Sequence, residues 1–236
     1  MTHATDPTFA QVLDERFSCR AFLPEPAEPQ VLDRLFRLAQ RTPSWCNTQP
    51  WQVHLVTGEA RDELAAHLAA AVTSAPGTSD LPTPERYEGV YQERRRASGF
   101  ALYESLGIAR EDTAARGAQM LRNFEFFGAP HVAIVTSDRL QGTYGAIDCG
   151  GYVATLTHAA TSLGLATCAQ AALAMYSNAV REFLDLPEGR VIVCGISLGR
   201  ADLDHPANGF RTERATVEDA VTVVDRRPAQ REEGAA

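Results

Sequence analysis

The stretch from Gly142 to Leu163 constrains the fold of this chain more than any other part of the sequence. It reads as one long, mostly apolar helix, with Ile147, Val153, Leu156 and Ala160 among its residues. A surface helix keeps a polar face toward water, whereas a helix that is apolar nearly all round is a buried one. We therefore expect one fully buried helix, around which the rest of the chain packs.

Three short apolar runs predict strands, at Gln52–Thr57, His131–Thr136 and Arg190–Ser197. Helical spacing or composition predicts helices between and around them, over residues 8–16, 29–41, 59–73, 87–107, 113–126 and 177–184. Three prolines and a glycine predict a loop over 74–86, and Leu165–Ala171 is short and ambiguous. Val217–Val224 begins as helix or extended chain and could end as a strand.

No repeat or linker divides this series of elements, so we expect a single α+β domain over residues 1–236. Its core covers about residues 9–224, a lid-like insert covers about 74–110, and a polar, frayed tail covers 225–236.

Charge and composition exclude several classes of function. The chain has 236 residues and a net charge of −8, which argues against nucleic acid or an anionic membrane as a partner. All 22 basic residues are arginine, so a Schiff-base lysine and a P-loop lysine are both impossible. The five cysteines form no C-x-x-C motif, and we expect neither disulfides nor a metal site. No membrane span or signal peptide is visible, and a cytoplasmic location is the default.

A G-x-S-x-G motif at Gly195–Gly199 follows an apolar strand, as in a nucleophile elbow. Such an elbow needs a helix after the serine, yet the chain continues from Arg200 with Asp, His and Pro. The one later histidine, His205, is too near Ser197 to fold back as its partner. We therefore interpret the motif as a strand end whose small residues allow close packing.

Three other segments carry polar groups suited to a phosphate and a heterocycle. Arg16–Arg20 (RFSCR) places two guanidiniums and a hydroxyl within five residues. The loop from Thr42 to Trp51 (TPSWCNTQPW) adds side-chain amides that both donate and accept hydrogen bonds, and Asn208–Arg214 (NGFRTER) adds two more arginines. Each segment alone could be a solvated helix end, a packed turn or surface charge, but together they favour a ligand.

Taken together and in this order, the R-x-S-x-R and P-S-x-x-N-x-Q-P-W motifs resemble those of the FMN-dependent nitroreductase family. The similarity extends from about residue 9 to 224, and the insert at roughly 83–107 resembles that of the nitrobenzoate-reductase-like branch. The resemblance implies a small, mainly antiparallel sheet surrounded by helices, in a domain-sharing homodimer with two FMN sites at its interface.

The resemblance also implies a role for each matching arginine and serine. Arg16 and Ser18 would hold the FMN phosphate, and Arg211 or Arg214 would complete the phosphate cage. Arg20 would lie near the N1/O2 edge of the flavin, where a fixed positive charge favours negative charge on the ring.

By the same resemblance, the remaining site residues would lie around the flavin ring. Pro43 and Ser44 would come from the partner subunit, while Asn47 and Gln49 would address the flavin or the pocket beside it. The last set comprises the backbone of Gln170 and Ala171, expected at flavin N5, together with Gly199 and Arg200 near the site.

The implied activity is a two-step hydride transfer through FMN, from NADH or NADPH to a nitroaromatic, quinone or similar electron-poor acceptor. No G-x-G-x-x-G motif is present, so the nicotinamide would bind transiently in the acceptor's pocket. Two alternatives remain open: another redox reaction on the same fold, such as dehydrogenation of a natural-product ring or dehalogenation, or a non-catalytic flavin-binding protein.

The insert suggests how a small aromatic acceptor could bind. Tyr91 and Arg95 share one helix face, and Phe100 lies one turn beyond Arg96. One hypothesis is that Tyr91, Arg95 and Phe100 stack on the acceptor and pair with its carboxylate. The alternative is an ordinary solvated, charged helix face.

Overall fold

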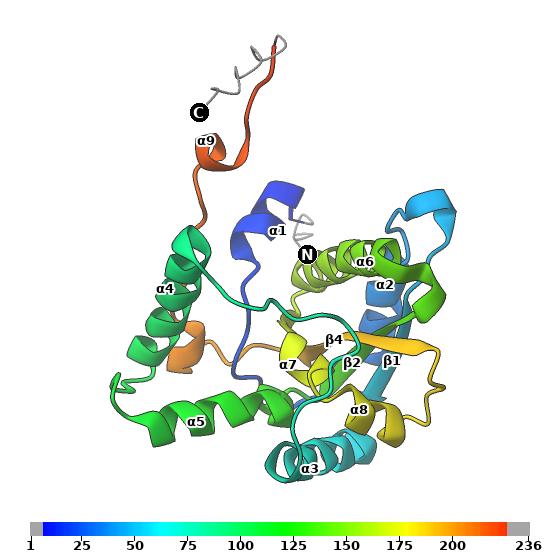
Figure 1. The fold of residues 1–236 in the computed structure, drawn as a ribbon, viewed down its shortest axis with the longest axis horizontal. Helices are drawn as coiled ribbons and strands as arrows, with labels where there is room; N and C mark the ends of the chain where they lie inside the picture. The colour runs from blue at the N-terminus through cyan, green and yellow to red at the C-terminus, as the bar shows by residue number, and fades with distance from the viewer. Residues whose placement is uncertain (1–6, 226–236) are drawn as a thin grey trace, which may run out of the picture.

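A four-stranded antiparallel sheet organises the computed structural model, which describes residues 7–225 (Figure 1). The strand order is β1-β2-β4-β3. The strands are β1 (Gln52–Thr57), β2 (His131–Asp138), β3 (Ala166–Gln170) and β4 (Arg190–Gly199). Every pair of neighbours is antiparallel, as expected for the α+β class. The ambiguous stretch after residue 165 is therefore a strand, and it forms the edge beyond β4.

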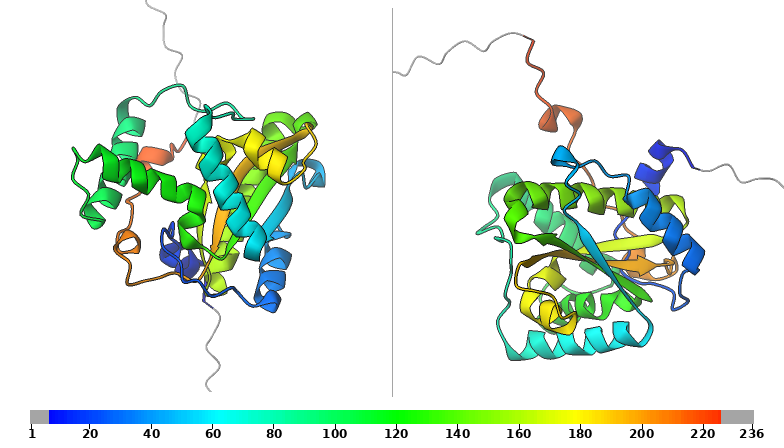
Figure 2. Two further views of the ribbon diagram at one scale, coloured as in Figure 1. Left: turned by 90° about the horizontal axis from the view of Figure 1, so that it is seen from below. Right: turned by 90° about the vertical axis from the view of Figure 1, so that its right-hand side faces the viewer.

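Helices cover both faces of this sheet, as the right-hand view of Figure 2 shows. Along β2, Val132 and Ile134 belong to one hydrophobic core, and Ala133 and Val135 belong to the other. Successive side chains of a strand point to opposite faces, so a strand buried on both sides reads as a continuous apolar run. This is why the sequence of β2 shows no polar alternation.

The helices divide between the two faces. One core packs under α3 (Gly58–Ser74), η2 (Arg122–Gly128), α7 (Ala171–Ala174) and α8 (Ser177–Phe183). The other packs under α2 (Pro29–Ala39) and α6 (Gly142–Ser162), while α1 (Phe9–Glu15) lies against α6. Among residues 7–225, no helix has the length and apolar character needed to cross a membrane.

The helix expected to be fully buried, α6, is buried on one face only. Cys149 and Leu156 are completely inaccessible, but Ile147 is 60% exposed and Tyr144 is 57% exposed. The prediction is wrong for the single chain, because the sheet covers only one side of the helix. The exposed side keeps the apolar character that made the sequence look buried.

Two further expectations need correction. The helix from Thr113 ends at Leu121 as α5 and continues as the 3-10 segment η2, in which Phe126 and Phe127 have left-handed φ values of 56° and 55°. Burial of both rings outweighs the strain of that backbone. The segment expected to end as a strand forms the short helix α9 (Val217–Ala220) and pairs with no strand in the described chain. The tail beyond residue 225 lies outside the described residues.

The insert contains the helix α4 (Gly89–Ser105), which stands with the following helix α5 beside the sheet-bearing body (Figures 1 and 2). No residue of either helix is fully buried. The last segment of the described chain, which contains α9, extends away from the body (Figure 1). The division into one domain with a lid over 74–110 stays a prediction.

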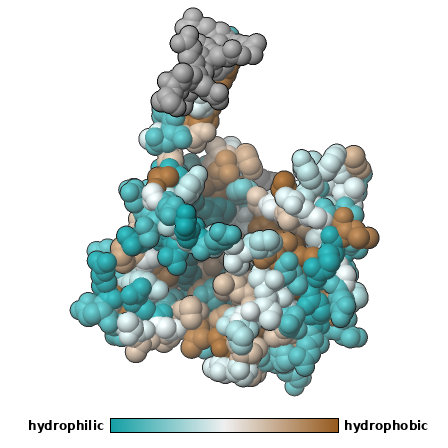
Figure 3. Space-filling view, in the orientation of Figure 1, coloured by the Kyte–Doolittle hydropathy of each residue, from teal (hydrophilic) through white to brown (hydrophobic). Residues whose placement is uncertain are grey.

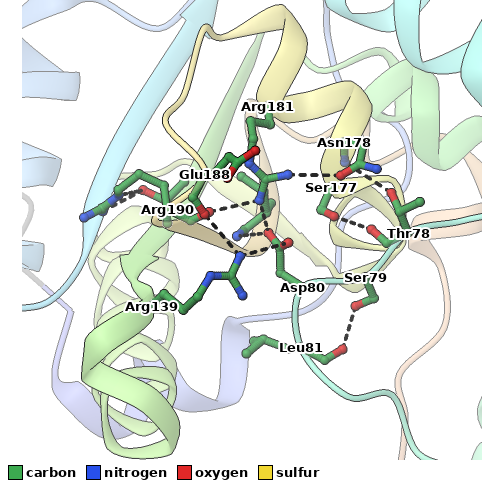
Figure 4. Close-up of polar contacts among 12 residues, drawn as sticks. Thr78, Ser79, Asp80, Leu81, Arg139, Ser177, Asn178, Arg181, Glu188 and Arg190 are labelled. Atoms are coloured by element: carbon green, nitrogen blue, oxygen red, sulfur yellow. Dashed lines mark hydrogen bonds and ion pairs between the residues drawn. The ribbon is translucent and has the colours of Figure 1, made fainter.

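The loop that leads to α4 is fastened to the body at Asp80 (Figure 4). The Asp80 carboxylate lies 2.7 Å from Nη2 of Arg181 and accepts a 2.9 Å hydrogen bond from the backbone N–H of Ile192. Both side chains of the ion pair are largely buried, at 9% and 15% exposed. Backbone and hydroxyl groups of Thr78 add hydrogen bonds to Ser177 and Asn178.

We expect Asp80→Ala to lower the free energy of unfolding by about 3 kcal/mol, because it leaves a buried guanidinium without its carboxylate. Asp33→Ala is the matched control, since the Asp33–Arg37 pair is 60% and 77% exposed. Its effect should stay below about 0.5 kcal/mol. Chemical denaturation measures both variants, and equal losses would contradict the assignment of Asp80 as the anchor.

Candidate functional site

A hollow of about 360 Å³ lies where the chain segment after α1 meets the segment after η4 (Pro206–Asn208). Its lining brings together the two arginine-containing motifs from opposite ends of the sequence. The lining residues are Leu13, Asp14, Arg16, Phe17, Ser18, Arg20, Ser98, Phe210, Arg211, Thr212 and Arg214. We call this hollow the arginine cradle. It contains every residue that the sequence assigned to a phosphate.

Backbone pairing fixes the first arm of the arginine cradle. Ser18 forms a parallel bridge with Thr167 of β3, and the N–H of Cys19 donates to the Thr167 carbonyl at 2.9 Å. The segment thus extends the sheet edge, which holds Arg16 and Arg20 on either side of a fixed backbone. Such a position is preorganised for a ligand.

The buried side chain of Asn208 joins the two arms of the arginine cradle. Its Oδ1 accepts from the Arg20 backbone N–H at 2.7 Å, and its Nδ2 donates to the carbonyls of Ala21 and Asp202 at 2.8 and 2.7 Å. Sequence reasoning placed Asn208 at the start of an arginine-containing segment but gave it no role. An asparagine directly before a glycine indicates a turn, which hid its function as a clamp.

The arginine cradle holds positive charge without compensation from carboxylates. Burial, followed by the nearby charges of Arg214 and Arg211, lowers the pKa of Arg16. Among residues 7–225, no acidic side chain lies within ion-pair distance of Arg16, Arg20 or the two C-terminal arginines, although Asp14 is part of the lining. Guanidiniums that gather without a counter-ion fit a bound dianion.

The choice between Arg211 and Arg214 stays open, since both line the hollow. The Arg211 guanidinium stacks 4.0 Å from the centre of the Phe17 ring and donates to the Asn208 carbonyl. The Arg214 guanidinium donates to Thr212. The stacked position of Arg211 is the more constrained of the two.

The loop from Thr42 to Trp51 contributes no residue to the lining of the arginine cradle. Pro43, Ser44, Asn47 and Gln49 therefore do not line it. Within the loop, Ser44 Oγ accepts from the Gln49 N–H at 2.9 Å, and Gln49 Nε2 donates to Asn47. Asn47 and Gln49 adopt left-handed φ values of 56° and 47°, so their side chains stand on a strained turn.

The residues expected at the end of the sheet have structural contacts of their own. Gln170 is 3% exposed, its Nε2 donates to the Asn123 carbonyl at 2.8 Å, and its Oε1 accepts from Ser197. A Cβ at Gly199 would lie 2.6 Å from Pro130 Cδ, so this glycine allows close packing. Ala171, Gly199 and Arg200 do not line the arginine cradle.

The same contacts exclude Ser197 as the exposed nucleophile of an elbow. Ser197 is completely inaccessible, and its hydroxyl donates a hydrogen bond to Gln170 Oε1. A Cβ at Gly195 would lie 2.2 Å from Leu173 Cδ1. The G-x-S-x-G sequence is therefore a packing motif, as interpreted from its context.

Comparison with known proteins identifies the family. The model of the nitroreductase family matches residues 13–200. The chain belongs to the nitroreductase family. It is 40% identical over 206 residues to nitroreductase NfnB of Mycolicibacterium smegmatis, covering 87% of this chain and 88% of the relative. It is 35% identical over 206 residues to 4-nitrobenzoate reductase of Pseudomonas putida, covering 87% and 91%.

A solved structure confirms the nitroreductase fold. The FMN-dependent nitroreductase NfnB from Mycobacterium smegmatis, in complex with NADPH, superposes with a TM-score of 0.86 and 38% identity. The match covers 92% of this chain and 100% of that chain. The small antiparallel sheet surrounded by helices, expected from the motifs, is therefore confirmed as the nitroreductase fold.

In this nitroreductase the three residues predicted to bind the acceptor do not share one hollow. Tyr91 is 70% exposed and lies in a shallow depression at the start of α4. Arg95 and Phe100 line a different hollow, between α4 and α5. The Arg95 guanidinium stacks 5.1 Å from the centre of the Tyr87 ring. The acceptor hypothesis for these residues stays a hypothesis.

Asn208→Ala should lower the free energy of unfolding by about 1–3 kcal/mol, because it removes three hydrogen bonds to the backbone and leaves the Arg20 N–H without an acceptor among the described residues. Asn178→Ala is the control, since that exposed side chain accepts one hydrogen bond, from Arg181. Its loss should stay within about 0.5 kcal/mol. Urea unfolding followed by circular dichroism compares the two variants. An unchanged free energy of unfolding in Asn208→Ala would contradict the role of Asn208 as a clamp.

Proposed function

We propose that this protein is an FMN-dependent oxidoreductase that uses NADH or NADPH to reduce nitroaromatic, quinone or similar electron-poor acceptors. The uncompensated charge of the arginine cradle carries the proposal. The names of the relatives, nitroreductase and 4-nitrobenzoate reductase, support the same class of reaction. Since the reaction consumes NADH or NADPH, we place the protein in the cytoplasm.

The chain fits the phosphate end of FMN. A phosphate monoester carries a charge of roughly −1.5 to −2 at neutral pH, which matches guanidiniums that lack carboxylate partners. We assign Arg16, Ser18 and Arg211 or Arg214 to the phosphate. Bound FMN supplies the two-step hydride transfer, from nicotinamide and then to the acceptor.

The protein's own groups would orient and tune this chemistry. Arg20 Nη1 donates to the Ser18 carbonyl at 3.2 Å, which fixes the guanidinium beside the arginine cradle. We assign it to the electron-rich N1/O2 edge of the ring, where its positive charge favours the reduced state. The backbone around Gln170 and Ala171 is proposed to meet N5, with Gly199 and Arg200 nearby.

We also propose a homodimer, because large apolar side chains are exposed on α1, on α6 and around α9. Ile147 and Tyr144 on α6 are joined by Phe9 on α1, which is 68% exposed. The extended segment around α9 exposes further apolar residues, including Val217, Val221, Val223 and Val224. Several large exposed apolar side chains on neighbouring elements are typical of an interaction site. A second copy would cover it and bring Pro43, Ser44, Asn47 and Gln49 to the partner's flavin site.

The purified protein should show an absorbance band near ~450 nm that bleaches without oxygen when NADH or NADPH is added. Arg16→Gln should weaken FMN binding at least tenfold, measured by quenching of flavin fluorescence. Arg37→Gln, an exposed arginine of α2, should leave binding unchanged. A protein that does not bind FMN would refute the proposal. One reduction without turnover of any acceptor would indicate a flavin carrier, and turnover confined to other acceptors would indicate a different redox reaction.

The dimer has its own test, by light scattering after gel filtration. The wild-type chain should have twice the mass of 25.6 kDa. Ile147→Asp should lower it toward the monomer, because burying a carboxylate without a partner is costly. Leu203→Asp, at a side chain 71% exposed on a turn after β4, should not change it. A stable wild-type monomer with bound FMN would contradict the dimer.

A further inference from the structure

A second arginine-lined hollow, of about 470 Å³, lies between α4 and α5. It is formed by the insert helix α4, the segment after it and α5, and it takes no part in the proposed binding of FMN. Its lining consists of Arg95, Arg96, Ser98, Gly99, Phe100, Tyr103, Arg110 and Arg116. We call it the lid pocket. Its place in the fold is informative, because Ser98 lines both the lid pocket and the arginine cradle.

The lid pocket contains four guanidiniums and no carboxylate. Within residues 7–225, none of the four arginines lies within 4.0 Å of an acidic side chain, although Glu104 lines the adjoining depression. Elsewhere in the described chain, Arg37, Arg122 and Arg181 each have such a partner. The surface over α4 is accordingly hydrophilic in Figure 3. Like charges repel, so solvated surface arginines have no reason to lie together. Four of them in one hollow therefore indicate a polyanionic ligand.

Two aromatic rings hold these guanidiniums in place. The Arg110 guanidinium lies 5.1 Å from the centre of the Phe100 ring, and that of Arg116 lies 4.9 Å from the centre of the Tyr103 ring. Arg116 Nη1 donates to the Arg110 carbonyl at 3.0 Å, while its Nε is buried and has no partner among the described residues. A buried N–H without an acceptor is costly, and a ligand oxygen would satisfy it.

The α4 sequence produces this wall by helical spacing. Arg96, Phe100 and Tyr103 follow one another at intervals of four and three residues, so they form one stripe. Gly99 lies beside that stripe, and a Cβ built there would meet no atom within 4 Å. The absence of a side chain at Gly99 keeps the lid pocket open.

We propose that the lid pocket binds the adenosine 2′-phosphate end of NADPH. The inference rests on the proposed function, which supplies the dinucleotide as electron donor. A carboxylated acceptor carries one negative charge and would leave three guanidiniums unmatched. A 2′-phosphate carries close to two negative charges, and the 5′ carbon of the same ribose bears the charged pyrophosphate. The adenine ring adds a flat surface on which guanidiniums and aromatic side chains stack. Arginine is also the residue that accommodates a 2′-phosphate in other folds.

Because Ser98 is shared, a ligand in the lid pocket lies next to FMN bound in the arginine cradle. NADPH could thus keep its adenosine end in the lid pocket while its nicotinamide reaches the flavin. Arg95 and Phe100 then serve the donor rather than a carboxylated acceptor. Binding of the acceptor's carboxylate becomes the competing outcome of the test.

The test measures binding of adenosine 2′,5′-bisphosphate and of AMP to the FMN-loaded protein by calorimetry. The wild type should bind the bisphosphate at least tenfold more tightly than AMP. Arg96→Gln and Arg110→Gln, both at exposed side chains that the fold does not need, should each weaken the bisphosphate at least tenfold and AMP less than threefold. Arg94→Gln is the matched control, since it removes the same charge from the same helix outside the lid pocket, and it should change neither ligand.

Anaerobic reduction of the flavin provides the second readout. The apparent Kd for NADPH should rise at least tenfold in Arg96→Gln and Arg110→Gln, and that for NADH should stay within threefold. Equal weakening of both donors, or unchanged binding of the bisphosphate, would overturn the assignment. So would a selective loss of reoxidation by 4-nitrobenzoate relative to nitrobenzene. A protein that binds the bisphosphate but is bleached by neither donor would refute the proposed function while leaving the lid pocket intact.

Discussion

The site depends on holding like charges together. Burial, together with the nearby charges of Arg214 and Arg211, lowers the pKa of Arg16. No carboxylate of the described chain forms an ion pair with any of the three arginines. Hydrogen bonds of the backbone hold these segments together instead. The segment around Ser18 is paired to β3, and Asn208 clamps it to the arm that carries the other two arginines. The stability of the sheet is therefore what keeps the arginine cradle ready for an anion.

The arginines of the lid pocket also lack carboxylate partners. Aromatic rings, rather than strand pairing, hold two of them in place. Phe100 and Tyr103 support the guanidiniums of Arg110 and Arg116, and the Asp80–Arg181 anchor fixes the loop from which the insert begins. The acidic residue Asp80 fastens the loop to the body, whereas no acidic side chain of the described residues forms an ion pair with an arginine of either hollow. An acidic protein can in this way present two strongly positive sites.

Burial of the sheet also explains why the sequence predicted β2 and β4 well but not the exposure of α6. The strands β2 and β4 are covered on both faces, so their sequences are mostly apolar. The predicted strands begin at the observed residues and end two residues before the observed ends. The helix α6 is equally apolar, but the sheet covers one side only, and Ile147 and Tyr144 are exposed. In the homodimer that we propose, the exposed apolar side of α6 would be buried against the second copy. The sequence therefore predicted the position of α6 but not its exposure in the single chain.

The sequence by itself determined the class of fold, most elements and which segments carry arginines and side-chain amides. Local spacing and turn residues carry that information, as in β1, where the predicted and observed bounds coincide, and in the arginines of the R-x-S-x-R motif. Only the tertiary structure decided which motifs meet. It joined Arg16 to Arg214, separated both from Asn47, and made Asn208 a clamp. These are contacts between residues far apart in the chain, set by sheet pairing and by the packing of two cores, and no local pattern encodes them.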